Sequence, residues 1–232
     1  FFSFMDCWTP MIFASLSVAV ALKTGLFNIG VSGQMLAAGF ITTITVGYST
    51  LSAPIAKPLV ILVAAVVGAL VGGLIGFLKY RFNINEVVSS IMLNYIIEYV
   101  VGFFINTRYV NPISRQSQPV SSEARLTLSG TKIGDLKFDI PLGIILAVIV
   151  VVIVKYIFDR TVLGYELKAV GSNQKASRYA GIPVGKNMIL AMMISGLLAG
   201  LAGASYYLGY YASIQPKVLS STGFDATAMA SK

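Results

Sequence analysis

The stretch LVILVAAVVGALVGGLIGFL, residues 59–78, decides the fold, because it holds 20 consecutive residues without one charge. The stretch NMILAMMISGLLAGLAGASYYLGYY, residues 187–211, is a second uncharged run, of 25 residues. A helix needs about 20 apolar residues to cross the hydrocarbon core of a membrane. Both stretches therefore predict transmembrane helices.

The composition of the whole chain agrees with a membrane protein. Hydrophobic residues make up 56% of the sequence and charged residues 11%, whereas soluble domains carry roughly 25% charged residues. The sequence has no histidine and one cysteine, Cys7, which excludes a disulfide framework, a cysteine metal cluster and a histidine general base. We find no catalytic motif and no metal-binding motif, so the sequence predicts neither an enzyme nor a cofactor site.

Six hydrophobic spans predict an all-α, polytopic helix bundle in the membrane, within a single domain that covers residues 1–232. Their approximate ranges are 10–26, 29–48, 59–79, 86–106, 141–158 and 187–211. A seventh span begins near residue 218. Because the sequence does not start with Met, we expect it to be a fragment of a longer protein.

Two long connections differ in charge. Residues 107–140 are polar, and the alternation in their second half predicts a short β-hairpin. Residues 159–186 are basic and rich in helix formers. Lys and Arg gather on the cytoplasmic side of membrane proteins, which predicts that 159–186 is cytoplasmic and 107–140 external. The net charge of +8 is then explained by basic residues that anchor the ends of the helices. The sequence has no basic stripe with interleaved aromatic residues, which would indicate a nucleic-acid-binding surface.

Two rows of small residues occur at spacing four, which places the members of each row on one helix face. Such rows allow helix backbones to approach closely. The rows are Gly68, Gly72 and Gly76, and Gly196, Gly200 and Ala204.

The segment GLFNIGVSGQ, residues 25–34, separates two hydrophobic spans with three glycines and two side-chain amides. Transporters build substrate sites from discontinuous helices of this kind. An ordinary tight loop between two helices explains the composition equally well.

Ser90, Asn94 and Glu98 lie at spacing four and therefore share one face of a helix. An acidic residue near the middle of a span usually faces the bundle interior or an aqueous cavity. We interpret this face as the lining of a solute path. An interhelical hydrogen-bond clamp is the alternative.

Four blocks of the sequence together resemble the membrane permeases of bacterial ABC importers for simple sugars and nucleosides. The blocks are LKTGLFNIGVSGQMLAAG (22–39), NEVVSSIMLNYI (85–96), LKAVGSNQKASRYAGIPVGKNMILAMMISGLLAGLAGA (167–204) and GFDATAMA (223–230). The second block is similar to the nucleoside branch, of purine or guanosine type, more than to the ribose branch. Ser32 departs from the pattern, because many relatives have an acidic residue there.

The resemblance implies the fold of type II ABC importer permeases, in a bacterial cell membrane, with at least one discontinuous helix. It implies that Asn28, Gly30, Gly33 and Gln34 line or shape the translocation path, and that Ser90, Asn94 and Glu98 are candidates for it. It also implies that Ala176, Gly181 and Ile182 belong to a cytoplasmic loop that couples the permease to an ATPase.

The same resemblance implies several partners. These are a cytoplasmic ATPase that binds the ATP, a second permease subunit that is identical or different, and an external solute-binding protein or lipoprotein. The chain itself binds no cofactor on this reading. A permease for ribose-type sugars, an ion-coupled secondary transporter and a purely structural membrane subunit remain the alternatives.

Overall fold

The computed structural model describes residues 2–49, 51–111, 116–121, 124–133 and 136–230. The helices are α1 (Phe2–Lys23), α2 (Val31–Thr42), α3 (Ala53–Phe82), α4 (Glu86–Phe104), α5 (Leu142–Arg160), α6 (Val162–Ser172), α7 (Gln174–Tyr179), α8 (Val184–Ala204) and α9 (Thr222–Ala230). Three π-helical turns extend α2, α4 and α8, namely η1 (Thr43–Gly47), η2 (Ile105–Tyr109) and η4 (Ser205–Tyr210). Two strands, β1 (Thr127–Ile133) and β2 (Leu136–Pro141), complete the described structure.

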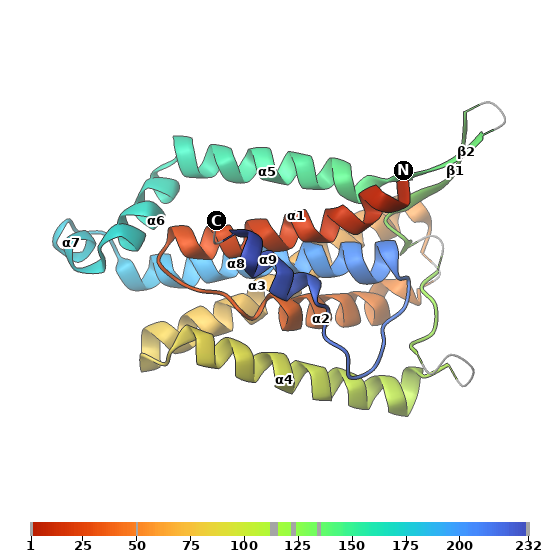
Figure 1. The fold of residues 1–232 in the computed structure, drawn as a ribbon, viewed down its shortest axis with the longest axis horizontal. Coiled ribbons are helices and arrows are strands. Elements are labelled where there is room, and N and C mark those ends of the chain that lie inside the picture. Colours follow the sequence, from red (N-terminus) through yellow and green to blue (C-terminus); the bar gives the residue numbers. More distant parts are fainter. Residues whose placement is uncertain (1, 50, 112–115, 122–123, 134–135, 231–232) are drawn as a thin grey trace.

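The long helices lie side by side in one bundle, with α8 at its centre (Figure 1). Among the described residues, five helices are long and apolar enough to cross a membrane: Met5–Lys23, Ala53–Phe82, Glu86–Tyr109, Leu142–Arg160 and Val184–Tyr210. The span that contains α8 is mostly buried, whereas α5 is mostly exposed at the edge. The chain is a multi-pass membrane protein, as its apolar runs predict.

Helix α8 contacts α3 through the two glycine rows. A Cβ atom added to Gly72 would overlap the carbonyl oxygen of Met192 and lie 2.8 Å from the Cα of Gly196. A Cβ atom on Gly68 would overlap the carbonyl oxygen of Gly196. The absence of side chains therefore brings the two backbones into direct contact, which confirms the packing that the spacing predicts.

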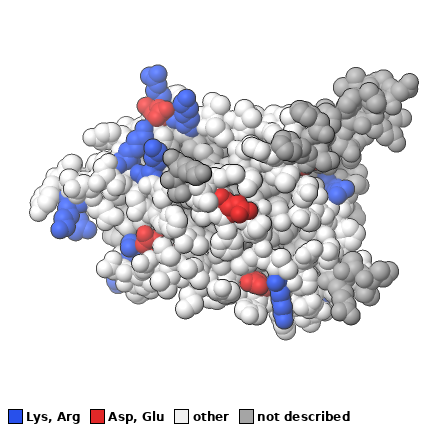
Figure 2. Space-filling model, in the orientation of Figure 1, with Lys and Arg blue, Asp and Glu red and all other residues white. Residues whose placement is uncertain are grey.

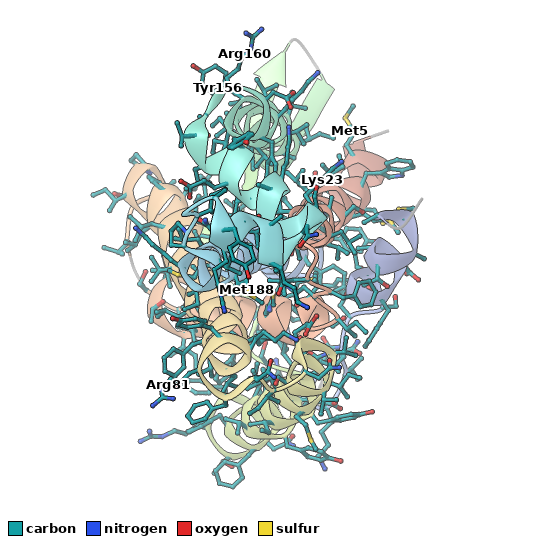
Figure 3. The ribbon with its side chains drawn as sticks, turned by 90° about the vertical axis from the view of Figure 1, so that its left-hand side faces the viewer. Met5, Lys23, Arg81, Tyr156, Arg160 and Met188 are labelled. Carbon is teal, nitrogen blue, oxygen red and sulfur yellow. The ribbon has the colours of Figure 1, made fainter. Side chains whose placement is uncertain are left out.

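The two ends of the bundle carry different segments. Helices α6 and α7 form a projection at one end, and the β-hairpin lies at the other (Figure 1). Many of the Lys and Arg side chains in the face of Figure 2 lie toward the first end. Seen from that end, Arg81 and Arg160 point outward at opposite edges, and Lys23 lies between them (Figure 3). These positions agree with the charge distribution expected of a cytoplasmic end, which stays a prediction.

The hairpin predicted in the second half of 107–140 is present. Strands β1 and β2 pair antiparallel, with Leu128 opposite Ile140 and Lys132 opposite Lys137. A register shift between Leu128 and Thr131 interrupts the ladder.

Several helix boundaries differ from the sequence-based ranges. Helix α1 begins at Phe2, eight residues before the predicted span 10–26, and ends at Lys23, three residues before the end of that span. Helix α3 begins at Ala53, six residues before the predicted span 59–79, because Pro54 lies in the first turn, where a missing N–H is tolerated. The predicted span 29–48 contains 12 residues of α2 and 5 of η1. At about 1.5 Å per residue, this helix is shorter than a hydrocarbon core of roughly 30 Å. It begins inside the bundle and not at its end (Figure 1).

Candidate functional site

Helical structure is interrupted between α1 and α2, over residues 24–30. This interruption, called the break below, forms the centre of the candidate site. Gly25 has φ of +71°, in the left-handed region that glycine adopts without strain. Residues 24–30 then run back into the bundle in non-helical conformation. Helix α2 therefore starts, at Val31, near the middle of the bundle (Figure 1). The two helices are thus joined by a non-helical segment that enters the bundle and not by a tight loop at its end, while a discontinuous helix of the transporter kind stays a prediction.

The side chain of Asn28 connects the break to its surroundings. It is fully buried, and its Nδ2 donates to Oε1 of Gln34 at 3.0 Å and to Oγ of Ser195 at 2.8 Å. Its Oδ1 accepts from the backbone N–H of Gly30 at 3.0 Å and from Nε2 of Gln34 at 3.3 Å. Non-helical backbone at membrane depth needs such internal partners. Asn28 and Gln34 therefore fix the shape of the break.

Ser195 of α8 extends this network to α1. The hydroxyls of Ser17 and Ser195 lie 3.0 Å apart, and each also donates to the other residue's carbonyl oxygen, at 2.7 and 2.8 Å. Both side chains are fully buried. The break is thus fixed to two full-length helices, and sequence reasoning did not single out either serine.

Asn94 of α4 holds the first turn of α2. Its Oδ1 accepts from the backbone N–H of Gly33 at 3.0 Å, and its Nδ2 donates to the carbonyl oxygen of Ile29 at 3.2 Å. The first N–H groups of a helix have no partner within the helix. A Cβ atom on Gly33 would overlap Oδ1 of Asn94 and lie 2.9 Å from its Cα. Gly33 is therefore required for the close approach of α4.

The other two residues of the predicted α4 face differ in environment. Ser90 is fully buried, and its hydroxyl has no hydrogen-bond partner among the residues that the structure describes. Glu98 lies half-buried one turn beyond Asn94. The structure thus joins Asn94 to the break, while the roles of Ser90 and Glu98 in a solute path stay predictions.

A second helix also begins near the middle of the bundle. Helix α9 starts at Thr222 and runs away from α2, with its beginning beside the beginning of α2 (Figure 1). The hydroxyl of Ser32 donates to the carbonyl oxygen of Ser220 at 3.0 Å. A Cβ atom on Gly223 would lie 2.7 Å from the backbone nitrogen of Ser32. Ser32, where the resemblance leads one to expect an acidic residue, is thus the contact between the two helix starts.

The segment before α9 encloses a hollow of about 280 Å³ that sequence reasoning missed. Its walls come from η4 and from the returning segment 213–221, which includes Gln215 and Ser220. Three tyrosines line it, Tyr206, Tyr207 and Tyr211. The repeated tyrosines in SYYLGYY, residues 205–211, were the available signal.

The predicted coupling residues lie in the projection formed by α6 and α7. Ala176 and Gly181 are exposed, and Ile182 is partly buried against the core below. Asn173 begins α7 by accepting at its Oδ1 from the N–H groups of Lys175 and Ala176, at 3.0 and 3.1 Å. Gly181 ends the projection with φ of +81° and has open space around its Cα. The projection is therefore a helical element with an exposed tip.

Helix α6 contacts the start of the break directly. A Cβ atom on Gly171 would overlap the carbonyl oxygen of Lys23 and lie 3.0 Å from the carbonyl carbon of Thr24. A Cβ atom on Gly25 would in turn lie 3.2 Å from the carbonyl oxygen of Gly171. Backbone contacts backbone here, so a displacement of α6 acts on the break without an intervening flexible side chain.

Comparison with known proteins identifies relatives over most of the chain. The chain is 39% identical over 226 residues to the guanosine ABC transporter permease protein NupP of Bacillus subtilis, covering 96% of this chain and 64% of the relative. It is 38% identical over 208 residues to the nucleoside ABC transporter permease protein NupB of Lactococcus lactis, covering 87% and 57%. A glucose ABC transporter permease protein of Haloferax volcanii, TsgB13, is 30% identical over 228 residues, covering 95% and 60%.

The chain spans about three fifths of the length of these relatives. No solved structure matches it. The family model described as "Branched-chain amino acid transport system / permease component" matches residues 2–230. Because this match covers nearly the whole chain, the protein belongs to this family of transport-system permease components.

Proposed function

We propose that this chain is a membrane-spanning permease subunit of an ATP-driven importer that moves nucleosides across the cell membrane. The observation that carries the nucleoside assignment is the 39% identity to a guanosine permease over 96% of this chain. Helix α2, which begins near the middle of the bundle and is held at its start by Asn28 and Asn94, gives the proposal a structural basis. In transporters such helix breaks lie at the solute path.

ATP hydrolysis takes place on a separate cytoplasmic ATPase in this proposal. The exposed projection with Ala176, Gly181 and Ile182 is the surface that the ATPase contacts. Its supporting observation is the backbone contact between Gly171 and the start of the break, which links the projection to the middle of the bundle. A ligand-driven change of this kind needs two states that the partner stabilises differently. We assign those states to two positions of α6 relative to the break.

Two further partners complete the proposed importer. A second permease subunit, identical or different, pairs with this chain in the membrane. An external solute-binding protein or lipoprotein delivers the nucleoside at the end that holds the β-hairpin. Asn28, Gly30, Gly33 and Gln34 shape the path, and Ser90, Asn94 and Glu98 are its candidate contacts on α4.

Uptake measurements test this proposal. Cells that lack the complete gene, and the same cells with the gene restored, are given labelled guanosine or labelled ribose, while ATP and the proton gradient are collapsed separately. We expect restored guanosine uptake that requires ATP. Restored ribose uptake without guanosine uptake would move the assignment to the sugar branch, which the 30% identity to a glucose permease keeps as second candidate.

The same experiment separates this proposal from an ion-coupled transporter. Glu98, half-buried in the middle of the α4 span, is the residue that an ion-coupled mechanism would use. Uptake that follows the proton gradient, ignores ATP and is lost in Glu98→Gln would favour that mechanism. A purely structural subunit would give no uptake that depends on this gene.

A further inference from the structure

The hollow beside η4 combines aromatic and uncharged polar walls. Two hollows elsewhere on the membrane-spanning helices have mostly apolar walls, and two others include charged side chains, such as Lys155 and Arg178. The walls of the hollow beside η4 combine the rings of Tyr206, Tyr207 and Tyr211 with the polar side chains of Gln215, Ser220 and Ser221. Small-molecule sites commonly combine aromatic surface with a few polar groups, in volumes from roughly 300 Å³ upward. A hollow of about 280 Å³ is close to that lower bound.

The position of this hollow is between the middle of the bundle and the end that holds the β-hairpin. Ser220, in its wall, accepts a hydrogen bond from Ser32 at the start of α2. At the opposite end of the hollow, the hydroxyl of Ser213 donates to the side chain of Gln116 at 2.9 Å. Gln116 lies in the segment that follows α4 and η2. The hollow thus extends from the helix break toward the predicted external surface.

The buried ring of Tyr207 forms part of the wall of the hollow. Its side chain is 4% exposed, and its ring is wedged against Gly39, where a Cβ atom would lie 3.0 Å from the ring Cγ. The tyrosine hydroxyl has no hydrogen-bond partner in the described part of the chain. The ring, and not this enclosed hydroxyl, is therefore what Tyr207 presents to the hollow.

The surface around the hollow carries exposed polar residues at membrane depth. Gln215, Lys217 and Asp225 are exposed, and the side chain of Lys217 lies against α4, 3.1 Å from the position of a Cβ atom on Gly102. Charged side chains at this depth usually face a water-filled cavity or another protein surface. The opening of the hollow is therefore on a face suited to an aqueous path.

We propose that this hollow binds the planar, nitrogen-containing base of a nucleoside during its passage, a step that rests on the proposed function above. Tyr206 and Tyr211, whose ring centroids lie 4.9 Å apart, offer the stacking surface, since aromatic side chains stack on bases of any sequence. The side-chain amide of Gln215 hydrogen-bonds to the heteroatoms of the base. The lining of three tyrosines suits a planar base better than a sugar alone.

Photolabelling tests where the base binds. The complete transporter, with its ATPase and solute-binding protein, is reconstituted in vesicles, supplied with 8-azidoguanosine during ATP-driven turnover and illuminated. We expect adducts within residues 205–221, suppressed by guanosine and not by ribose. Adducts confined to other segments, in vesicles that still import guanosine with ATP, would overturn the site and leave the proposed function intact. Absence of any ATP-driven guanosine import would overturn both.

Substitutions test the contribution of stacking. Tyr211 lines the hollow and is 48% exposed, whereas its neighbour Tyr210 does not line it and is 42% exposed. We expect Tyr211→Leu to lower ATP-driven guanosine uptake by about tenfold, from the usual contribution of one stacked base. Guanosine uptake by Tyr210→Leu should stay within about twofold of that by the unaltered transporter, because Tyr210 does not line the hollow and stacks on no base. Tyr211→Phe keeps an aromatic ring and should retain most uptake. Equal losses in the two leucine variants, or no loss in Tyr211→Leu, would overturn the proposal.

Discussion

The side-chain amide of Asn94 accepts from the backbone N–H of Gly33 at 3.0 Å and so begins a helix 61 residues away in sequence. The same amide donates to the carbonyl oxygen of Ile29 at 3.2 Å. One side chain on α4 therefore satisfies an acceptor at the end of the break and a donor in the first turn of α2. Their alternative partner, water, is absent from a hydrocarbon core. The α4 face predicted from Ser90, Asn94 and Glu98 thus contains at least one interhelical clamp.

Replacing Asn94 with Ala should destabilise the permease by about 1–3 kcal/mol, because it leaves a buried N–H and a buried carbonyl group unpaired. The measurement is the midpoint of thermal unfolding of the purified protein in detergent. Ser90→Ala is the matched control, since Ser90 lies one turn earlier, is also buried and makes no hydrogen bond within the described residues. Equal midpoints for the two variants would contradict the clamp.

Adjacent glycines of α3 should respond differently to alanine. A Cβ atom on Gly72 would overlap the backbone of α8, whereas one on Gly73 would meet only the flexible side chain of Met193, at 2.8 Å from its Cγ. Gly72→Ala should cost roughly 1–3 kcal/mol through overpacking, and Gly73→Ala much less. Thermal unfolding of both variants checks this difference. A larger loss in Gly73→Ala would show that the two helices pack through another face.

Gly171→Ala should disconnect the projection from the break. The added methyl group would push α6 away from the carbonyl groups at Lys23 and Thr24. We expect the reconstituted transporter to hydrolyse ATP while importing several-fold less solute per ATP. Gly209→Ala is the control, because a Cβ atom there has nothing within 4 Å. An unchanged ratio of solute imported to ATP hydrolysed would remove α6 from the transmission pathway.

Gly181→Arg should block docking of the ATPase at the exposed tip of the projection. The variant is expected to reach the membrane in normal amounts but to lose uptake and to copurify with less ATPase. Gly181→Ala controls for the φ of +81°, which strains any side chain. If Gly181→Ala loses as much ATPase as Gly181→Arg, backbone strain explains the effect. Normal uptake by Gly181→Arg would contradict docking at this tip.

The sequence by itself determined the features that depend on residues close together in the chain. Uncharged runs such as 59–78 establish membrane helices, since their length matches the hydrocarbon core. The alternation in the second half of 107–140 predicts the hairpin that β1 and β2 form. Spacing four in the row from Gly68 to Gly76 predicts the close helix contact, because helical periodicity places these residues on one face.

Only the tertiary structure decided how distant residues satisfy one another. Asn28 meets Ser195 across 167 positions, and Ser32 meets Ser220 across 188. Local spacing gives no information about such pairs, because they depend on where the chain returns after several helices. The same return of segment 213–221 creates the hollow against Tyr207. Local chemistry selected the membrane helices, and the need to satisfy buried polar groups without water fixed the geometry of the break between them.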